Sequence, residues 1–170
     1  MAFTVVPDAC LRPLNTFGVA GRAARLIDVE QPADVAAAVA EARTTPPLLV
    51  LGAGSNVLFT RDFPGTVVHL RTRGRRVLAS SAASAVVEAE AGENWDAFVR
   101  WTLAEGLAGL ENLSLIPGTV GASPIQNIGA YGVEMCEHFD ALTAIDLATL
   151  ARREFSAADC AFGYRDSVFK

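Results

Sequence analysis

Residues 48–59 read LLVLGAGSNVLF, a short apolar run that enters a Gly-X-Gly turn. The run predicts a buried strand over Leu48–Leu51, and a strand followed by such glycines begins a dinucleotide-binding Rossmann fingerprint. That fingerprint continues to a third glycine and to a helix whose N-terminus holds the pyrophosphate. Here the third position is Val57, and Pro64 and Gly65 interrupt any helix within two turns. The stretch therefore argues against a Rossmann fold.

Residues 52–56, Gly-Ala-Gly-Ser-Asn, still form a tight turn of small residues. Glycines let successive backbone N–H groups point at one place, and such a nest binds phosphate without a helix. An ordinary turn at the end of a strand is the alternative, and these five residues alone leave both open. A second glycine-rich segment, 117–132, favours phosphate binding, because two such loops can clamp a diphosphate ligand from both sides. Tight turns alone account less well for two long loops than for one.

Hydrophobic periodicity predicts strands and helices on either side of these loops. Strands are expected at residues 24–30, 66–70 and 85–91, with a hairpin of 142–147 and 151–155. Pro32 opens an alanine-rich helix that ends at Arg43. Asn94 caps a second helix that ends at Gly106. Each helix follows a strand, so we expect two βαβ-like units. Residues 113–132 predict irregular structure, and loops this long inside a domain are usually functional.

The composition indicates a hydrophobic core under an acidic surface: 51% of the 170 residues are hydrophobic, and the formal net charge is −5. Nucleic acid is not an expected partner, because proteins that bind it normally carry a basic field. The arginines of residues 71–76 are interpreted as a solvated turn between strands, with phosphate contact as the alternative. No apolar run approaches the roughly 18 residues that span a membrane, and the N-terminus lacks a signal-peptide pattern. We therefore expect a cytoplasmic protein with no membrane partner.

The cysteines and histidines are too few and too scattered for a disulfide framework or a metal site. The three cysteines, Cys10, Cys136 and Cys160, include no CxxC pair, and only two histidines are present to complete a zinc site. We expect three reduced, mostly buried thiols and no metal.

Six blocks of sequence carry a family resemblance. In chain order they are RPLNTFG (12–18), LGAGSNVL (51–58), AGENW (91–95), GLENL (109–113), IPGTVGASPIQNIGAYG (116–132) and GYRDS (163–167). Together, and in this order, they resemble the UDP-N-acetylenolpyruvoylglucosamine reductase family of flavoenzymes. The resemblance runs from Arg12 to the end of the chain.

The resemblance implies an α+β fold of the vanillyl-alcohol-oxidase (PCMH) type, not a Rossmann fold, with two α+β lobes that hold FAD. The lobes would span residues 1–75 and 76–170. It also implies an oxidoreductase in which NADPH reduces the flavin, and the flavin reduces UDP-N-acetylenolpyruvoylglucosamine to UDP-N-acetylmuramate for peptidoglycan synthesis, cell-wall biogenesis, cell shape and cell division. Neither glycine-rich loop contains histidine, so we expect FAD to bind non-covalently. The expected partner is this small-molecule substrate, and the whole enzyme is expected to be a monomer.

The resemblance also implies roles for individual residues. Tyr164 and Arg165 match the substrate-binding block, and Arg165 is the expected catalytic residue, because a guanidinium binds a carboxylate and stabilises a developing enolate. From the residues alone, an ion pair of Arg165 with Asp166 or Asp159 is the alternative. The residues expected to contact or lie near FAD are Asn15, Thr16, Gly52, Ala53, Gly54, Ser55, Asn56, Pro117, Gly118, Gly121, Ala122, Ser123, Ile125, Asn127, Gly129 and Tyr131.

The chain departs from the family in length. Family members take their proton-donating serine and its carboxylate partner from a later substrate-binding domain, and no residue here matches either motif. We therefore expect an FAD-binding portion that is inactive alone. The alternative is a cofactor-free interaction or scaffold module that keeps the fold, for which self-association of exposed apolar surface is expected.

Overall fold

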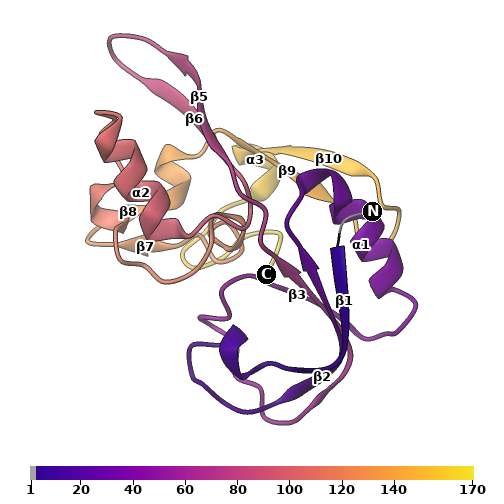
Figure 1. Cartoon of the computed structure of the whole chain (residues 1–170). Helices are drawn as coiled ribbons and strands as arrows, with labels where there is room; N and C mark the ends of the chain where they lie inside the picture. Colours follow the sequence, from indigo (N-terminus) through magenta and orange to yellow (C-terminus); the bar gives the residue numbers. More distant parts are fainter. Residues whose placement is uncertain (1–2) are drawn as a thin grey trace. The chain divides into compact units, whose positions relative to one another are not determined.

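The structure, a computed structural model, describes residues 3–170 as short helices joined to small sheets (Figure 1). The residues group into two units. The first ends at Thr72 and also contains Ile145–Ala151, and the second comprises Arg73–Ala144 and Arg152–Lys170. The division into FAD-binding lobes at residues 1–75 and 76–170 stays a prediction.

The first unit is built on a four-stranded sheet with the order β1-β2-β4-β3. Its strands are β1 (Phe3–Cys10), β2 (Arg22–Val29), β3 (Leu48–Leu51) and β4 (Phe63–Leu70). β1 is antiparallel to β2, whereas β2 and β3 both run parallel to β4. The chain crosses from β2 to β3 through a 3-10 turn, Pro32–Asp34, and helix α1 (Val35–Ala42). This is the first βαβ-like crossover that the sequence predicts.

Apolar side chains pack on both faces of this sheet, because successive residues of a strand point to opposite sides. One cluster joins the sheet to α1 and consists of Ile27, Val29, Ala38, Ala42 and Val68. The other joins it to the loops before β2 and after β3 and consists of Ala9, Leu11, Ala23, Leu26, Leu51, Phe59 and Val67. The glycine turn at residues 52–56 therefore lies between two residues of this second cluster, Leu51 and Phe59.

The second unit surrounds an aromatic core formed by Trp95, Phe98, Val99, Leu113 and Met135. Its longer elements are β5 (Arg75–Ser80), β6 (Ala85–Ala89), α2 (Trp95–Ala104), β9 (Ala141–Ile145) and β10 (Arg152–Ser156). Its short elements are the 3-10 turns Glu111–Leu113, Val120–Ala122 and Met135–His138, the strands β7 (Gly129–Ala130) and β8 (Val133–Glu134), and α3 (Ala157–Cys160).

The second predicted βαβ-like unit is wrong. β6 pairs antiparallel with β5, and no strand among residues 3–170 pairs in parallel with β6 after α2. The reason lies in Arg75 and Arg76, which the sequence places in a solvated turn but which begin β5. The two strands form a hairpin that is complete before α2 begins.

The predicted start and end of α2 are confirmed, whereas the helix expected from Pro32 to Arg43 is a 3-10 turn at Pro32–Asp34 followed by α1 over Val35–Ala42. The Asn94 side chain accepts a hydrogen bond from the Ala97 backbone N–H over 2.9 Å, which caps α2. Gly106 follows the helix with a φ of +74°, a left-handed conformation that favours glycine. The predicted pairing of residues 142–147 with 151–155 is confirmed as β9 and β10.

Three further observations concern the surface. All three cysteines are free. Cys160 is buried, but Cys10 is exposed and Cys136 is half-buried, so the expectation of mostly buried thiols is wrong for these two. Arg73 and Arg76 pair with Glu93 and Glu88, in keeping with a solvated basic segment. None of the helices within residues 3–170 has the length and apolar character that crossing a membrane demands.

Candidate functional site

The glycine turn of the first unit rests on the turn at residues 14–16. Gly54 has a φ of +60°, and a Cβ at this position would lie 2.0 Å from the Leu14 carbonyl oxygen. The Thr16 backbone N–H donates to the Gly54 carbonyl over 3.2 Å. The structure thus brings Thr16 and Gly54 together, two residues expected at the same cofactor although they are distant in sequence. Only glycine fits at position 54.

Asn15 shapes this region through its side chain, which is buried. Its amide nitrogen donates to the carbonyl oxygens of Leu11 and Val19 over 2.8 and 3.1 Å, and its oxygen accepts from the Val19 N–H over 3.1 Å. The side chain therefore closes the loop that supports Gly54. Ala53 and Asn56 of the glycine turn are exposed, and no helix begins between β3 and β4. The absence of a Rossmann helix here is the predicted result.

The glycine loop of the second unit is fixed to the segment that precedes α2. The Gly121 N–H donates to the Ala91 carbonyl, and the Val120 N–H donates to the Glu93 carbonyl, each over 2.9 Å. The Trp95 N–H donates to the Gly118 carbonyl over 3.2 Å. Residues 118–121 therefore lie along residues 91–95, which places two of the resembling blocks side by side.

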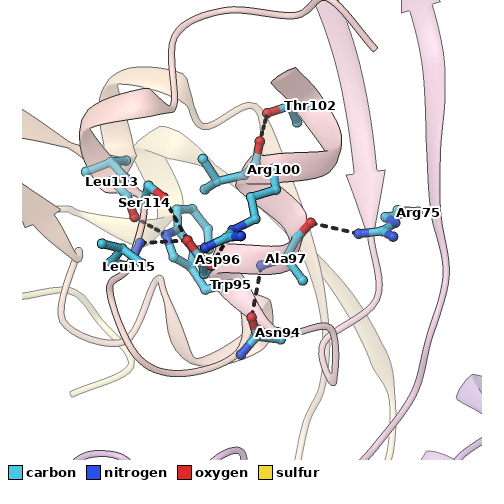
Figure 2. A network of polar contacts seen from close by, with 11 residues as sticks. Arg75, Asn94, Trp95, Asp96, Ala97, Arg100, Thr102, Leu113, Ser114 and Leu115 are labelled. Carbon is cyan, nitrogen blue, oxygen red and sulfur yellow. Dashed lines mark hydrogen bonds and ion pairs between the residues drawn. The ribbon is translucent and has the colours of Figure 1, made fainter. Parts of the chain in front are cut away.

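The Asp96 carboxylate binds the residues that come just before this loop in the chain (Figure 2). Its carboxylate accepts from the Ser114 hydroxyl over 2.7 Å, from the Leu115 N–H over 2.8 Å and from the Arg100 guanidinium over 2.8 Å. The Ser114 and Leu115 hydrogen bonds favour the charged form and lower the pKa of Asp96 below its ordinary value. Leu115 has a left-handed φ of +62° and is 75% exposed. Sequence reasoning missed Asp96, because its partners lie 18 and 19 residues away.

Arg165 lies against the end of the same loop. Its Nη1 donates to the Asn127 carbonyl over 3.2 Å, and its Nη2 donates to the Gly129 carbonyl. The guanidinium carbon lies 5.5 Å from the ring centroid of Tyr164, whose side chain is 84% exposed. A Cβ on Gly129 would lie 2.8 Å from Arg165 Nη1, so glycine permits this close approach.

The ion pairs that the sequence left open for Arg165 are not formed within residues 3–170. Asp159 instead accepts from the N–H and hydroxyl of Ser156, over 2.9 and 2.6 Å, and closes the cap of α3. Asp166 lies 4.0 Å from the Lys170 ammonium. Arg165 is therefore held by two neutral carbonyl groups. No carboxylate within the described residues forms an ion pair with it.

The remaining predicted residues divide by exposure. The exposed ones are Pro117, Gly121, Ile125 and Tyr131, of which Tyr131 is 88% exposed. Ser123 is buried, and its hydroxyl donates to the Val120 carbonyl over 2.7 Å. The structure thus forms two clusters, one in each unit. The first contains Asn15, Thr16, Gly52, Ala53, Gly54, Ser55 and Asn56, and the second contains Pro117, Gly118, Gly121, Ala122, Ser123, Ile125, Asn127, Gly129, Tyr131, Tyr164 and Arg165.

A family model described as "FAD binding domain" matches residues 23–152. The chain belongs to this family. The FAD cofactor and the α+β fold implied by the resemblance are confirmed by this membership and by the solved structure described next. Neither glycine-rich loop, at residues 52–56 and 117–129, contains an acidic side chain that would repel a diphosphate.

The predicted resemblance is confirmed by relatives of this FAD-binding chain. Two curated proteins named UDP-N-acetylenolpyruvoylglucosamine reductase are similar to the chain. The protein from Azoarcus sp. (strain BH72) is 58% identical, and the alignment covers 98% of this chain and 49% of that protein. The protein from Pseudomonas aeruginosa is 54% identical, and the alignment covers 100% of this chain and 50% of that protein. The crystal structure of this reductase from Thermus caldophilus superposes with a TM-score of 0.73 at 27% identity, covering 98% of this chain and 57% of that one. The chain spans about half the length of the curated relatives it matches.

Proposed function

We propose that the chain supplies the flavin-binding part of an NADPH-dependent reductase that converts UDP-N-acetylenolpyruvoylglucosamine to UDP-N-acetylmuramate for peptidoglycan synthesis. The relatives' names and the FAD-binding family support this proposal. The observation that carries it is the position of Arg165, a guanidinium that forms no ion pair within residues 3–170 and is held by the last residues of a glycine-rich loop. An anion-binding group beside a flavin loop is what reduction of a carboxylate-bearing enolpyruvyl group requires.

In this proposal the two glycine-rich loops hold FAD non-covalently. Small side chains at 52–54 leave backbone N–H groups of the first turn within reach of pyrophosphate oxygens, in the manner of a nest. In the second loop the N–H groups of residues 120–123 donate to backbone carbonyls, so its small side chains contribute room for the cofactor and not a row of donors. Gly54 and Gly121 are each held so closely by a neighbouring segment that a larger residue would displace the loop. The bound flavin supplies the hydride chemistry, and the chain's own residues fix its diphosphate.

Arg165 would bind the substrate carboxylate and stabilise negative charge that develops next to it. A guanidinium carries five N–H donors, and two groups of this one are engaged by Asn127 and Gly129. The remaining donors are available for a bidentate contact with a carboxylate. Tyr164, exposed beside the guanidinium, would cover the same ligand.

The proposed reductase is cytoplasmic and monomeric, and its partner is the nucleotide-sugar substrate rather than nucleic acid or a membrane. The test is NADPH oxidation by the FAD-loaded enzyme of which this chain is the flavin-binding part, measured with and without the enolpyruvyl substrate. Oxidation that depends on the substrate and is lost in R165A is the expected result. FAD-loaded protein that oxidises NADPH equally well without the substrate would overturn the proposal.

A further inference from the structure

Asn127 is the most deeply buried polar residue of the second glycine loop. Its side chain is fully buried, with 0% exposed, in a segment whose neighbours Gln126 and Ile128 are both only half-buried. A buried amide costs free energy unless its donors and acceptor are all satisfied. The contacts that satisfy this amide therefore show what the residue does.

All the contacts of the Asn127 side chain are internal to the second unit. Its Nδ2 donates to Glu134 Oε2 over 2.9 Å and to the Gly163 carbonyl over 3.0 Å. Its Oδ1 accepts from the Cys136 N–H over 3.1 Å. Both N–H groups and the oxygen are thus engaged by the protein, so this side chain has no donor left to offer a cofactor.

These contacts join the two chain segments that meet at Arg165. The Asn127 carbonyl accepts from the Arg165 guanidinium, while the Asn127 side chain holds the Gly163 carbonyl, two residues before that arginine. Ser167, two residues after it, donates its hydroxyl to the Ile125 carbonyl over 2.8 Å. The turn that carries Arg165 is therefore fixed to the loop on both sides of the guanidinium.

We propose that Asn127 is a positioning residue that sets the direction of the Arg165 guanidinium, with Glu134 as its support. The inference rests on the proposed role of Arg165 and deepens it. Glu134 accepts from the Asn127 amide and is itself fixed, because its backbone N–H donates to the Glu137 carboxylate over 2.7 Å. Asn127 has a left-handed φ of +41°, which asparagine and aspartate tolerate better than most residues.

The test exchanges single atoms at the Asn127–Glu134 contact. N127D keeps the shape, the backbone preference and the oxygen that accepts from Cys136, but it removes both donors and places a carboxylate against Glu134. E134Q is the comparison variant: its amide oxygen can still accept from Asn127, although the substitution replaces one oxygen of the carboxylate that also caps the turn Met135–His138. In the double variant N127D/E134Q, the amide introduced at position 134 can donate to the new carboxylate, so the contact is restored in the opposite direction.

The first readout is the NMR spectrum of the chain labelled with ¹⁵N-arginine, in which R165K identifies the Arg165 signals. In the parent chain and in E134Q we expect resolved guanidinium N–H signals that exchange slowly with water. N127D is expected to average and broaden them, and the double variant to recover them in part. Arg165 signals in folded N127D that match the parent would overturn the inference.

The second readout is steady-state kinetics of the FAD-loaded enzyme of which this chain is the flavin-binding part. N127D and R165K are each expected to lower the substrate-dependent rate about tenfold or more, with FAD content unchanged, and their combination to be no slower than R165K alone. Additive losses would overturn the inference, because residues that act through one group are not additive. An inactive parent protein would instead count against the proposed function, and the arginine spectra would still decide the inference.

Discussion

Gly121 and Ala91 approach so closely that a Cβ on Gly121 would lie 2.6 Å from the Cβ of Ala91. Carbon atoms do not pack at this distance, so any side chain at position 121 must move one of the two segments. Because the same residues also share a 2.9 Å backbone hydrogen bond, that movement would break the attachment of the glycine loop.

The first prediction follows from this contact. G121A is expected to weaken FAD binding by about tenfold or more, which corresponds to about 1.4 kcal/mol and lies within the usual cost of overpacking. A91G/G121A removes the colliding methyl group and should recover part of the loss. Titration of each variant with FAD, followed by flavin fluorescence, measures both.

G106A is the matched control for this prediction. Gly106 has a left-handed φ of +74°, which Gly121 lacks, and apart from its chain neighbours no atom lies within 4 Å of a Cβ placed there. Its substitution should cost about 1 kcal/mol of stability through backbone strain and leave FAD affinity unchanged. Equal losses of FAD affinity in G106A and G121A would show that general destabilisation, and not the loop contact, is responsible.

The second prediction concerns Asp96 and pH. Its pKa is lowered first by the Ser114 hydroxyl and then by the Leu115 N–H, so the folded state favours the carboxylate. A group with a lowered folded-state pKa stabilises the protein above its unfolded pKa of about 3.9, and this contribution is lost as the pH falls through the folded-state pKa. D96N should therefore lower the free energy of unfolding at pH 7 and show a weaker acid dependence.

D159N is the control that distinguishes an effect on the loop, measured as FAD binding, from an effect on the acid dependence of stability. The pKa of Asp159 is also lowered, by the Ser156 hydroxyl and backbone N–H, but this carboxylate caps α3. D159N should likewise flatten the acid dependence of stability, measured by urea unfolding between pH 3 and pH 7. Only D96N should also weaken FAD binding, and a comparable loss in D159N would argue against a specific role of Asp96 in the loop.

The third prediction concerns the cap of α2. N94A removes the acceptor for the Ala97 N–H and should cost about 1 kcal/mol of stability, whereas N94G should cost only a few tenths. Urea unfolding of the three proteins measures the difference. Equal stability of N94A and the parent would show that water replaces the cap without loss.

The sequence predicted the elements that carry a strong local signal. The apolar run of β3, the alanine-rich α1 and the capped α2 each follow from a few neighbouring residues. β1 was missed, because it is an edge strand with mostly exposed residues and contains Pro7, which normally argues against a strand. β7 and β8 were missed because strands of two residues have no periodicity.

The candidate site was predictable as a set of loops but not as a set of contacts. The sequence motifs identified Asn127 and Arg165, yet their hydrogen bond joins residues 38 positions apart. Nothing in the letters QNIG shows that the asparagine is buried and its side chain fully engaged. Long-range hydrogen bonds of this kind depend on the packed fold, and they decide which residues shape the site and which can meet a ligand.

The most direct test of the central claim, that this chain binds FAD non-covalently through its glycine-rich loops, is an equilibrium titration of the purified chain with FAD followed by absorbance and fluorescence. We predict saturable binding of one FAD, a shifted flavin spectrum, release of the flavin on denaturation, and weaker binding in G121A. A chain that is folded by circular dichroism but shows no saturable change with FAD, and elutes from gel filtration as the same oligomer with or without it, would contradict the claim and favour a cofactor-free scaffold.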